Sequence, residues 1–116
     1  MFAQPIPEIS VEELAQKLTS PERDTLQLID VREPEEVAIA RIEGFSILSL
    51  SRFAEWSGNI LQTFDPEQET LVLCHHGMRS AQMCQWLASQ GFTNLKNIIG
   101  GIDAYARRVD KSISLY

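Results

Sequence analysis

Short apolar runs that favour β-strands alternate with segments of helical period along almost the whole sequence. The β-type runs fall at residues 26–31, 45–48, 70–73 and 95–99, after a short extended lead-in at residues 5–9. Apolar residues recur at helical spacing in residues 11–19, 51–64, 80–90 and 102–109. Strands that alternate with helices predict an α/β fold, in which a mostly parallel sheet is flanked by helices on both faces. In such sheets, ligands bind beyond the carboxyl ends of the strands.

Two segments leave their structure open. The acidic run at residues 33–36 contains a proline and is typical of the solvated first turn of a short helix. Gly58 weakens the helical pattern of residues 51–64, so one helix and two short pieces are both compatible with it. Phe53 and Trp56 in this segment are more typical of a core than of a substrate-binding wall.

Charge and composition argue against several classes of protein. The net charge of −6 disfavours nucleic acid as a partner, and no apolar run approaches the ~20 residues of a membrane span. Residues 1–5 lack the basic start and the apolar stretch of a signal peptide. Two cysteines in 116 residues do not form a disulfide framework. We therefore expect a cytoplasmic protein with reduced thiols and no membrane partner, and find no pattern that fixes its oligomeric state.

The sequence CHHGMRS at residues 74–80 directly follows the clearest strand run, residues 70–73. Backbone N–H groups in such a tight loop can form an anion-binding nest, and the helix that follows directs positive partial charge toward the same point. Arg79 is expected to add a full positive charge. These effects favour the thiolate over the thiol, and the thiolate is the nucleophile. Cys74 is therefore the predicted catalytic residue.

The remaining loop residues are predicted to bind the substrate. Gly77 suits a loop that needs positive φ, and Ser80 is expected to cap the following helix and to donate to a bound anion. The two histidines are expected to line the outer wall of the loop, where a partly protonated imidazole attracts anions. The predicted substrate-binding residues are His75, His76, Gly77, Met78, Arg79 and Ser80.

Asp30 lies at the end of the β-type run at residues 26–31, and Arg32 directly follows it. The carboxyl ends of parallel strands meet at one edge of the sheet, so both residues should lie near Cys74. An ordinary surface ion pair between them would contribute little. We favour structural support of the site over a direct role in catalysis.

The loop CHHGMRS resembles the active-site loop of the rhodanese family. Three other motifs are similar to that family in the same order: DVREPEE at residues 30–36, RIEG at 41–44 and GGIDAY at 100–105. Arg41 stands where the family usually has a histidine, after Ala40 rather than glycine. The resemblance implies a rhodanese-like three-layer domain over residues 8–109, with residues 110–116 as a C-terminal tail.

The resemblance also implies a reaction. The Cys74 thiolate would take a sulfane sulfur from thiosulfate or a persulfide donor, and would pass it to cyanide or a thiol acceptor. This is covalent catalysis in two steps by a thiosulfate or persulfide sulfurtransferase, and it needs no metal or organic cofactor. The donor would be a small sulfur-containing anion or a protein persulfide.

Other roles for the cysteines and histidines are less favoured. Cys84 lies on the apolar face of the helix predicted at residues 80–90 and is expected to be a buried core residue. A disulfide between Cys84 and Cys74 is disfavoured because a helix face and a loop mouth point in different directions. A metal site is disfavoured because the side chains of the adjacent His75 and His76 should diverge, and the spacing matches no usual zinc pattern.

Three rival functions remain. Cysteine phosphatases use a similar loop with five residues between cysteine and arginine, whereas only four stand between Cys74 and Arg79. A non-catalytic regulatory binding module would not need the cysteine. A persulfide carrier dedicated to one protein partner would share the chemistry but would turn over thiosulfate poorly.

Overall fold

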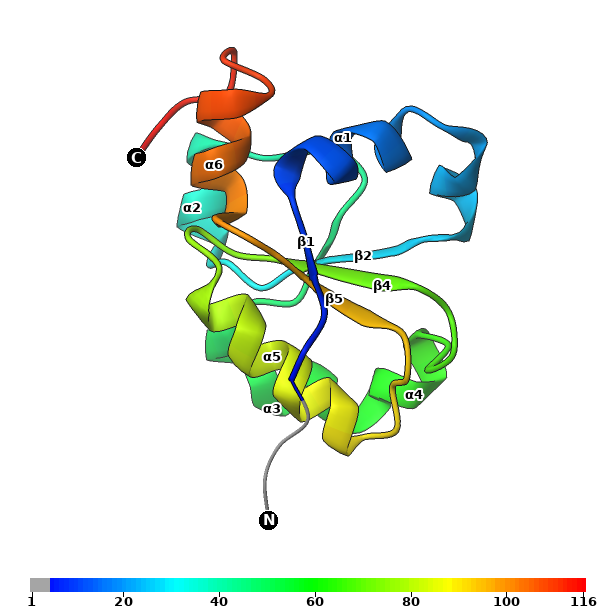
Figure 1. The fold of residues 1–116 in the computed structure, drawn as a ribbon. Helices are drawn as coiled ribbons and strands as arrows, with labels where there is room; N and C mark the ends of the chain where they lie inside the picture. Colours follow the sequence, from blue (N-terminus) through cyan, green and yellow to red (C-terminus); the bar gives the residue numbers. More distant parts are fainter. Residues whose placement is uncertain (1–4) are drawn as a thin grey trace.

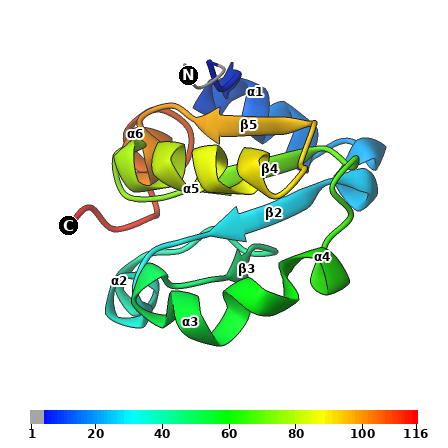
Figure 2. The ribbon, with the colours of Figure 1, turned by 90° about the horizontal axis from the view of Figure 1, so that it is seen from below.

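Five parallel strands form a single sheet in the computed structural model, which describes residues 5–116. The order across the sheet is β1-β5-β4-β2-β3. The strands are β1 (Glu8–Ile9), β2 (Gln27–Asp30), β3 (Ser46–Ile47), β4 (Thr70–Leu73) and β5 (Leu95–Ile98). The predicted parallel sheet is therefore confirmed. Figure 2 shows β2 and β5 pointing toward the same end of the sheet, where α2, α6 and the C-terminal segment gather.

Helices cover both faces of the sheet, which confirms the three-layer prediction (Figure 1). On one face lie α1 (Val11–Leu18) and α6 (Gly101–Arg108), and on the other lie α3 (Phe53–Trp56), α4 (Ile60–Thr63) and α5 (Met78–Ser89). The short helix α2 (Pro34–Ile39) follows β2 at the end of the sheet. The chain also forms short 3-10 helices, which are η1 (Pro21–Thr25), η2 (Leu50–Arg52) and η3 (Ser57–Asn59).

The central strand β4 divides the core into two clusters. Side chains alternate between the faces of a strand, so Leu71 and Leu73 pack on the side of α1 and α6, whereas Val72 packs on the side of α5. The same alternation turns Cys74 toward the cluster of α5. The topology of the sheet therefore decides which helix faces the sulfur.

Two segments differ from the local predictions. Residues 51–64, for which one helix and two short pieces were both open, form a succession of 3-10 and α-helical turns, η2, α3, η3 and α4. The helix predicted to begin at Ser80 begins at Met78, and its N-cap is Gly77 rather than Ser80. Ahead of β2, Ser20 caps the 3-10 helix η1 by accepting a hydrogen bond from the Glu22 amide.

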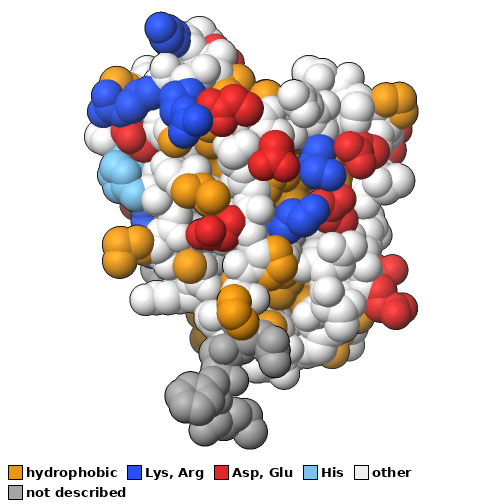
Figure 3. Space-filling view, in the orientation of Figure 1, with side chains coloured by type: hydrophobic (Ala, Val, Ile, Leu, Met, Phe, Trp, Pro, Cys, Tyr) orange, Lys and Arg blue, Asp and Glu red, His pale blue; other side chains and the backbone are white. Residues whose placement is uncertain are grey.

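Among residues 5–116, no helix has the length and apolar character needed to cross a membrane. On the face drawn in Figure 3, Lys and Arg side chains lie beside Asp and Glu, so this face is not uniformly basic. The prediction that residues 1–5 are not a signal peptide falls mostly on residues 1–4, which lie outside the described part of the chain.

Candidate active site

Cys74 lies at the bottom of a pocket of about 220 Å³ beyond the carboxyl end of β4. The residues that line the pocket are Cys74, His75, His76, Met78 and Arg79. All five belong to the predicted loop. Met78 is the most exposed of them, with 77% of its surface open, and Cys74 is only 1% exposed. The sulfur is therefore shielded from bulk water, with its approach bounded by two imidazoles and a guanidinium.

Two hydrogen-bond donors point at the sulfur. The Gly77 amide donates to Cys74 Sγ over 3.0 Å, and the Ser80 hydroxyl lies 3.2 Å from the same atom. Gly77 has a φ of 105°, which glycine adopts readily and other residues rarely do. This conformation lets the chain turn back so that its amide faces Cys74 just before α5 begins. Donors in these positions can hydrogen-bond to negative charge on a bound sulfur atom.

Ser80 also connects the sulfur to β5. Its hydroxyl lies 2.5 Å from Asn97 Oδ1, and the side-chain Nδ2 of Asn97 donates to the Gly77 carbonyl over 3.0 Å. A hydroxyl carries one proton, so Ser80 can donate to the sulfur or to Asn97 but not to both at once. Asn97 is a site residue that the sequence analysis did not identify, since an asparagine within a short strand gives no signal of its own.

Arg79 was expected to add a full positive charge to the loop, but in the structure this charge is paired. Its two terminal nitrogens donate to the two carboxylate oxygens of Glu36 over 2.6 and 2.8 Å. This bidentate pair holds the pKa of Glu36 well below its usual value, at about 2. The prediction that residues 33–36 are solvated is therefore wrong for Glu36, which is bound to Arg79 of the Cys74 loop.

Asp30 and Arg32 form a fully buried ion pair rather than a surface pair. Arg32 donates from Nε and Nη2 to the Asp30 carboxylate over 2.8 to 3.2 Å, and both residues are 0% exposed. Asp30 pairs in register with Leu73, the residue before Cys74. The pair thus lies one strand away from the sulfur, and a buried pair is costly to break by removing one partner.

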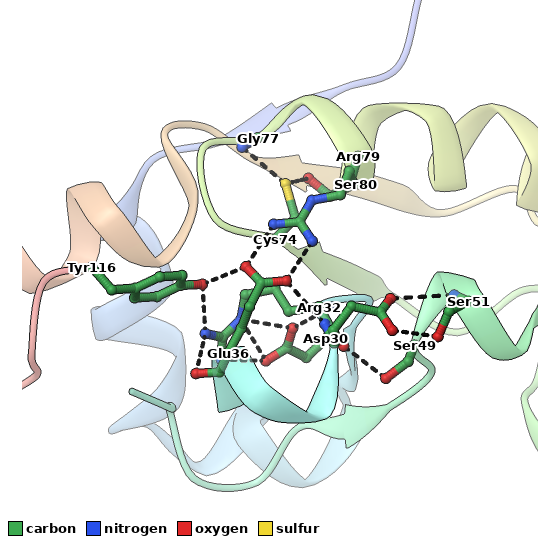
Figure 4. Close-up of polar contacts among 11 residues, drawn as sticks. Asp30, Arg32, Glu36, Ser49, Ser51, Cys74, Gly77, Arg79, Ser80 and Tyr116 are labelled. Atoms are coloured by element: carbon green, nitrogen blue, oxygen red, sulfur yellow. Dashed lines mark hydrogen bonds and ion pairs between the residues drawn. The ribbon is translucent and has the colours of Figure 1, made fainter. Parts of the chain in front are cut away.

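Tyr116 joins the two ion pairs, as Figure 4 shows. Its hydroxyl donates to Glu36 Oε2 over 2.8 Å and accepts from Arg32 Nη1 over 2.9 Å. A continuous polar network therefore runs from the buried Asp30 to Arg79 at the pocket. Residues 110–116, which were expected to form a C-terminal tail, pack on the domain, with Ile113 and Tyr116 against its core.

The two histidines stack instead of diverging, which corrects one argument of the sequence analysis. The ring centroids of His75 and His76 are 3.9 Å apart, and the other face of His75 stacks on Tyr116, also at 3.9 Å. Burial and the neighbouring His76 lower the pKa of His75. His75 therefore favours the neutral form and is less able to attract anions by charge than was expected.

The stacking also brings His75 and His76 near Asp103 of α6. One potential ligand atom of each residue lies within 4.8 Å of the others. Ligands around a tetrahedral zinc ion stand only about 3.4 Å apart, given metal–nitrogen distances of 2.0–2.1 Å. Asp103 also already accepts from Arg107 over 3.0 Å. The arrangement as it stands is wider than a zinc site, and we assign no metal to it.

The first turn of α6 holds the start of the Cys74 loop through backbone hydrogen bonds. The Ile102 and Asp103 amides donate to the carbonyls of Cys74 and His75 over 3.0 and 3.1 Å. A Cβ on Gly101 would lie 2.4 Å from both of these carbonyl oxygens, so only a glycine fits there. The double glycine at the start of α6 therefore allows the close approach that anchors the loop.

The other singled-out residues lie away from the pocket lining. Cys84 is fully buried on α5, its pKa is raised to about 12 by burial, and both cysteines are free thiols, as predicted. Phe53 and Trp56 form edge-to-face contacts with Trp86 at centroid distances of 4.9 to 5.8 Å. Arg41 is exposed and pairs with the exposed Glu43, a contact of little energetic value.

Comparison with known proteins places these features in a family. The model of the rhodanese-like domain matches residues 10–108. Rhodanese-like/PpiC domain-containing protein 12, chloroplastic, from Arabidopsis thaliana is 47% identical over 114 residues, which are 97% of this chain and 38% of that protein. Thiosulfate sulfurtransferase GlpE from Actinobacillus succinogenes is 32% identical over 80 residues, which cover 69% of this chain and 68% of that protein.

A solved structure agrees with this relationship. The crystal structure of a rhodanese-like domain protein from Staphylococcus aureus matches with a TM-score of 0.73 and 25% identity, over 96% of this chain and 99% of that one. The chain therefore belongs to the rhodanese-like domain family, among whose members are proteins named as sulfurtransferases. It spans 38% of the length of the plant relative.

Proposed function

We propose that this chain is a sulfurtransferase that moves a sulfane sulfur from thiosulfate or a persulfide donor to a thiophilic acceptor through a persulfide on Cys74. The observation that carries this proposal is the pocket in which the Cys74 sulfur faces both the Gly77 amide and the Ser80 hydroxyl. The name of the bacterial relative supports thiosulfate as the donor. The two free thiols are compatible with a reducing compartment such as the cytoplasm.

The first step forms the persulfide. The Cys74 thiolate attacks the outer sulfur of thiosulfate, a new S–S bond forms, and the old S–S bond breaks with its electron pair leaving on sulfite. The negative charge then rests on the terminal sulfur of Cys74–S–S⁻. The amide of Gly77 and the hydroxyl of Ser80 stand where they can stabilise charge on either sulfur.

The second step returns the enzyme to its starting state. An acceptor such as cyanide or a thiolate attacks the terminal sulfur, the Cys74–S–S bond breaks, and its electron pair returns to Cys74 as thiolate. Cyanide leaves as thiocyanate and a thiolate leaves as a persulfide. No net oxidation or reduction of the protein takes place, and the side chains that assist are those that line the pocket.

Intact-mass spectrometry tests the proposal. The protein incubated with thiosulfate should become heavier by one sulfur atom, and cyanide should remove the added mass. Peptide mapping should place the sulfur on Cys74 and not on Cys84, which is buried with a raised pKa and serves as an internal control. Cys74→Ser should remain unmodified. An unmodified Cys74 after treatment with several sulfane donors would contradict the proposal.

Two alternatives lead to different outcomes in the same experiment. A persulfide carrier would gain the sulfur but would pass it slowly to cyanide and rapidly to one protein partner, which a mixed disulfide at Cys74 could trap. A non-catalytic binding module would show no adduct at all. The depth of Cys74, which is 1% exposed, favours acceptors that can place a narrow nucleophile in the pocket.

A further inference from the structure

The side chain of Tyr116 contacts one residue that lines the Cys74 pocket directly and a second one through Glu36. Tyr116 is not part of the pocket lining. Its ring stacks on His75 with an interplanar angle of 6°, and its hydroxyl donates to Glu36, which in turn binds Arg79. His75 and Arg79 are the lining residues to which Tyr116 is thus linked. We infer that Tyr116 is a positioning residue for the proposed sulfur transfer, with its hydroxyl fixing Arg79 through Glu36 and its ring fixing His75.

The hydroxyl acts on Glu36. The two carboxylate oxygens of Glu36 accept from Arg79, from Tyr116 and from the Glu33 amide. Burial raises the pKa of Tyr116, so the hydroxyl keeps the proton that it donates. A carboxylate held by donors on several sides has little freedom to rotate. The guanidinium bound to it is therefore presented to the pocket in one orientation.

The hydroxyl is itself held from the opposite side. It accepts from Arg32, which is 0% exposed and bound to the Asp30 carboxylate. The position of Tyr116 is thus set by a buried group that has no freedom to follow a displaced tail. Tyr116 therefore does more than cover the surface. Its hydroxyl links Arg32, which follows the end of β2, to Glu36, which binds Arg79 of the pocket.

The ring acts on His75. This imidazole lies between Tyr116 on one face and His76 on the other, both at a centroid distance of 3.9 Å. Its Nε2 is buried without a hydrogen-bond partner in the described residues, so no side-chain hydrogen bond at that atom fixes the ring. Removing the aromatic ring of Tyr116 takes away the packing on one face of His75, which lines the pocket of Cys74.

The inference rests on the proposed function only where it concerns turnover. Three variants separate the role of the Tyr116 hydroxyl from the role of its ring. Tyr116→Phe keeps the ring and removes the hydroxyl, whereas Tyr116→Leu removes both. Tyr105→Phe is the matched control, because Tyr105 is the other tyrosine of the chain, packs from α6 into the core, and does not line the pocket of Cys74. Thermal unfolding establishes that each variant is folded.

Steady-state kinetics with thiosulfate and cyanide provide the first measurement. We expect Tyr116→Phe to raise KM for thiosulfate by about three- to tenfold with kcat changed less than about twofold, since one hydrogen bond that acts through Glu36 is lost. Tyr116→Leu should raise KM further, and Tyr105→Phe should match the unchanged protein. A KM for Tyr116→Leu equal to that of the unchanged protein would overturn the inference.

The NMR signals of the His75 ring provide the second measurement, which does not depend on sulfur chemistry. Protons over the face of a stacked aromatic ring are shifted upfield by its ring current. The His75 ring signals should move downfield in Tyr116→Leu and return toward their original position in Tyr116→Phe. Signals that stay in place in Tyr116→Leu would refute the stacking arm. If the unchanged protein forms no persulfide, the proposed function fails, while these spectra still decide whether Tyr116 positions His75.

Discussion

The Arg79 guanidinium and the Glu36 carboxylate are joined through two parallel hydrogen bonds of 2.6 and 2.8 Å. The two residues come from different elements, Arg79 from the first turn of α5 and Glu36 from α2. The charge of the loop arginine is thereby compensated before any anion reaches the pocket. An anion that enters the pocket therefore meets the Arg79–Glu36 ion pair, whose two charges largely cancel, and not an uncompensated cation.

This pair makes stability depend on pH in a defined direction. The pKa of Glu36 is about 2 in the folded protein, below its ordinary value of 4.5, because Arg79 binds the carboxylate. The stabilisation is fully present above about pH 4.5 and is lost as the pH falls toward 2. We expect Glu36→Gln to lower the free energy of unfolding by about 2 kcal/mol at pH 7, and by much less at pH 3. Urea unfolding at both pH values measures the difference, and an equal loss at both would contradict this explanation.

A second prediction concerns the charge balance at the pocket. Arg79→Gln leaves the Glu36 carboxylate without its cation, so the pocket should repel anions. Alkylation of Cys74 by the anion iodoacetate should slow by about tenfold relative to the neutral iodoacetamide, a change of about 1.4 kcal/mol. The double variant with Glu36→Gln should recover most of this ratio. A ratio that stays low in the double variant would show that the loss is geometric rather than electrostatic.

The donor from Ser80 gives a third prediction. Its hydroxyl lies 3.2 Å from Cys74 Sγ and is shared with Asn97 Oδ1, and without it the Gly77 amide is the donor that remains at the sulfur. Alkylation of Cys74 by iodoacetamide at pH 7 should be about three- to tenfold slower in Ser80→Ala. Ser89→Ala is the matched control, because Ser89 is exposed at the other end of α5. Equal rates in Ser80→Ala and the control would remove Ser80 from the site.

Gly101 gives the fourth prediction. A Cβ at this position would lie 2.4 Å from the carbonyl oxygens of Cys74 and His75, and the φ of 61° is unfavourable for other residues. Gly101→Ala should lower the free energy of unfolding by about 2–4 kcal/mol and disturb the loop. Gly58→Ala is the control, since no atom lies within 4 Å of its added Cβ, and it should be neutral or slightly stabilising. Chemical unfolding of both variants tests the contrast.

The order and type of the main elements could be predicted because each depends on local signals. The run at residues 70–73 is β4 in full, and the alternation of strands and helices is sufficient to predict a parallel sheet. The segment 51–64 was harder because its four short turns are shaped by packing of Phe53 and Trp56 against Trp86, a contact between distant parts of the sequence. Local period carries no information about such contacts.

The candidate site divides in the same way. The loop from Cys74 to Ser80 could be recognised because its residues are contiguous and their chemistry is distinctive. The partners of that loop come from elsewhere: Glu36 from α2, Asn97 from β5 and Tyr116 from beyond α6. Asn97 and Tyr116 are ordinary residue types in ordinary contexts, and Glu36, although it lies in the motif at residues 30–36, was expected to be solvated, so no local signal placed any of the three at the loop. The helix start at Met78 was also missed, because its cap is the backbone of Gly77 and not a serine side chain.

The segment after α6 has a consequence for how the protein responds to warming. It is held to the domain through few groups, chiefly the packing of Ile113 and Tyr116 and the hydrogen bonds of the Tyr116 hydroxyl. Segments with few buried contacts open at lower free energy than the sheet that carries them. Release of this segment would remove the contacts of Tyr116 with His75 and Glu36, while Glu36 keeps its bonds to Arg79 and all five strands remain paired. We therefore expect the proposed activity to be lost on warming before the sheet unfolds.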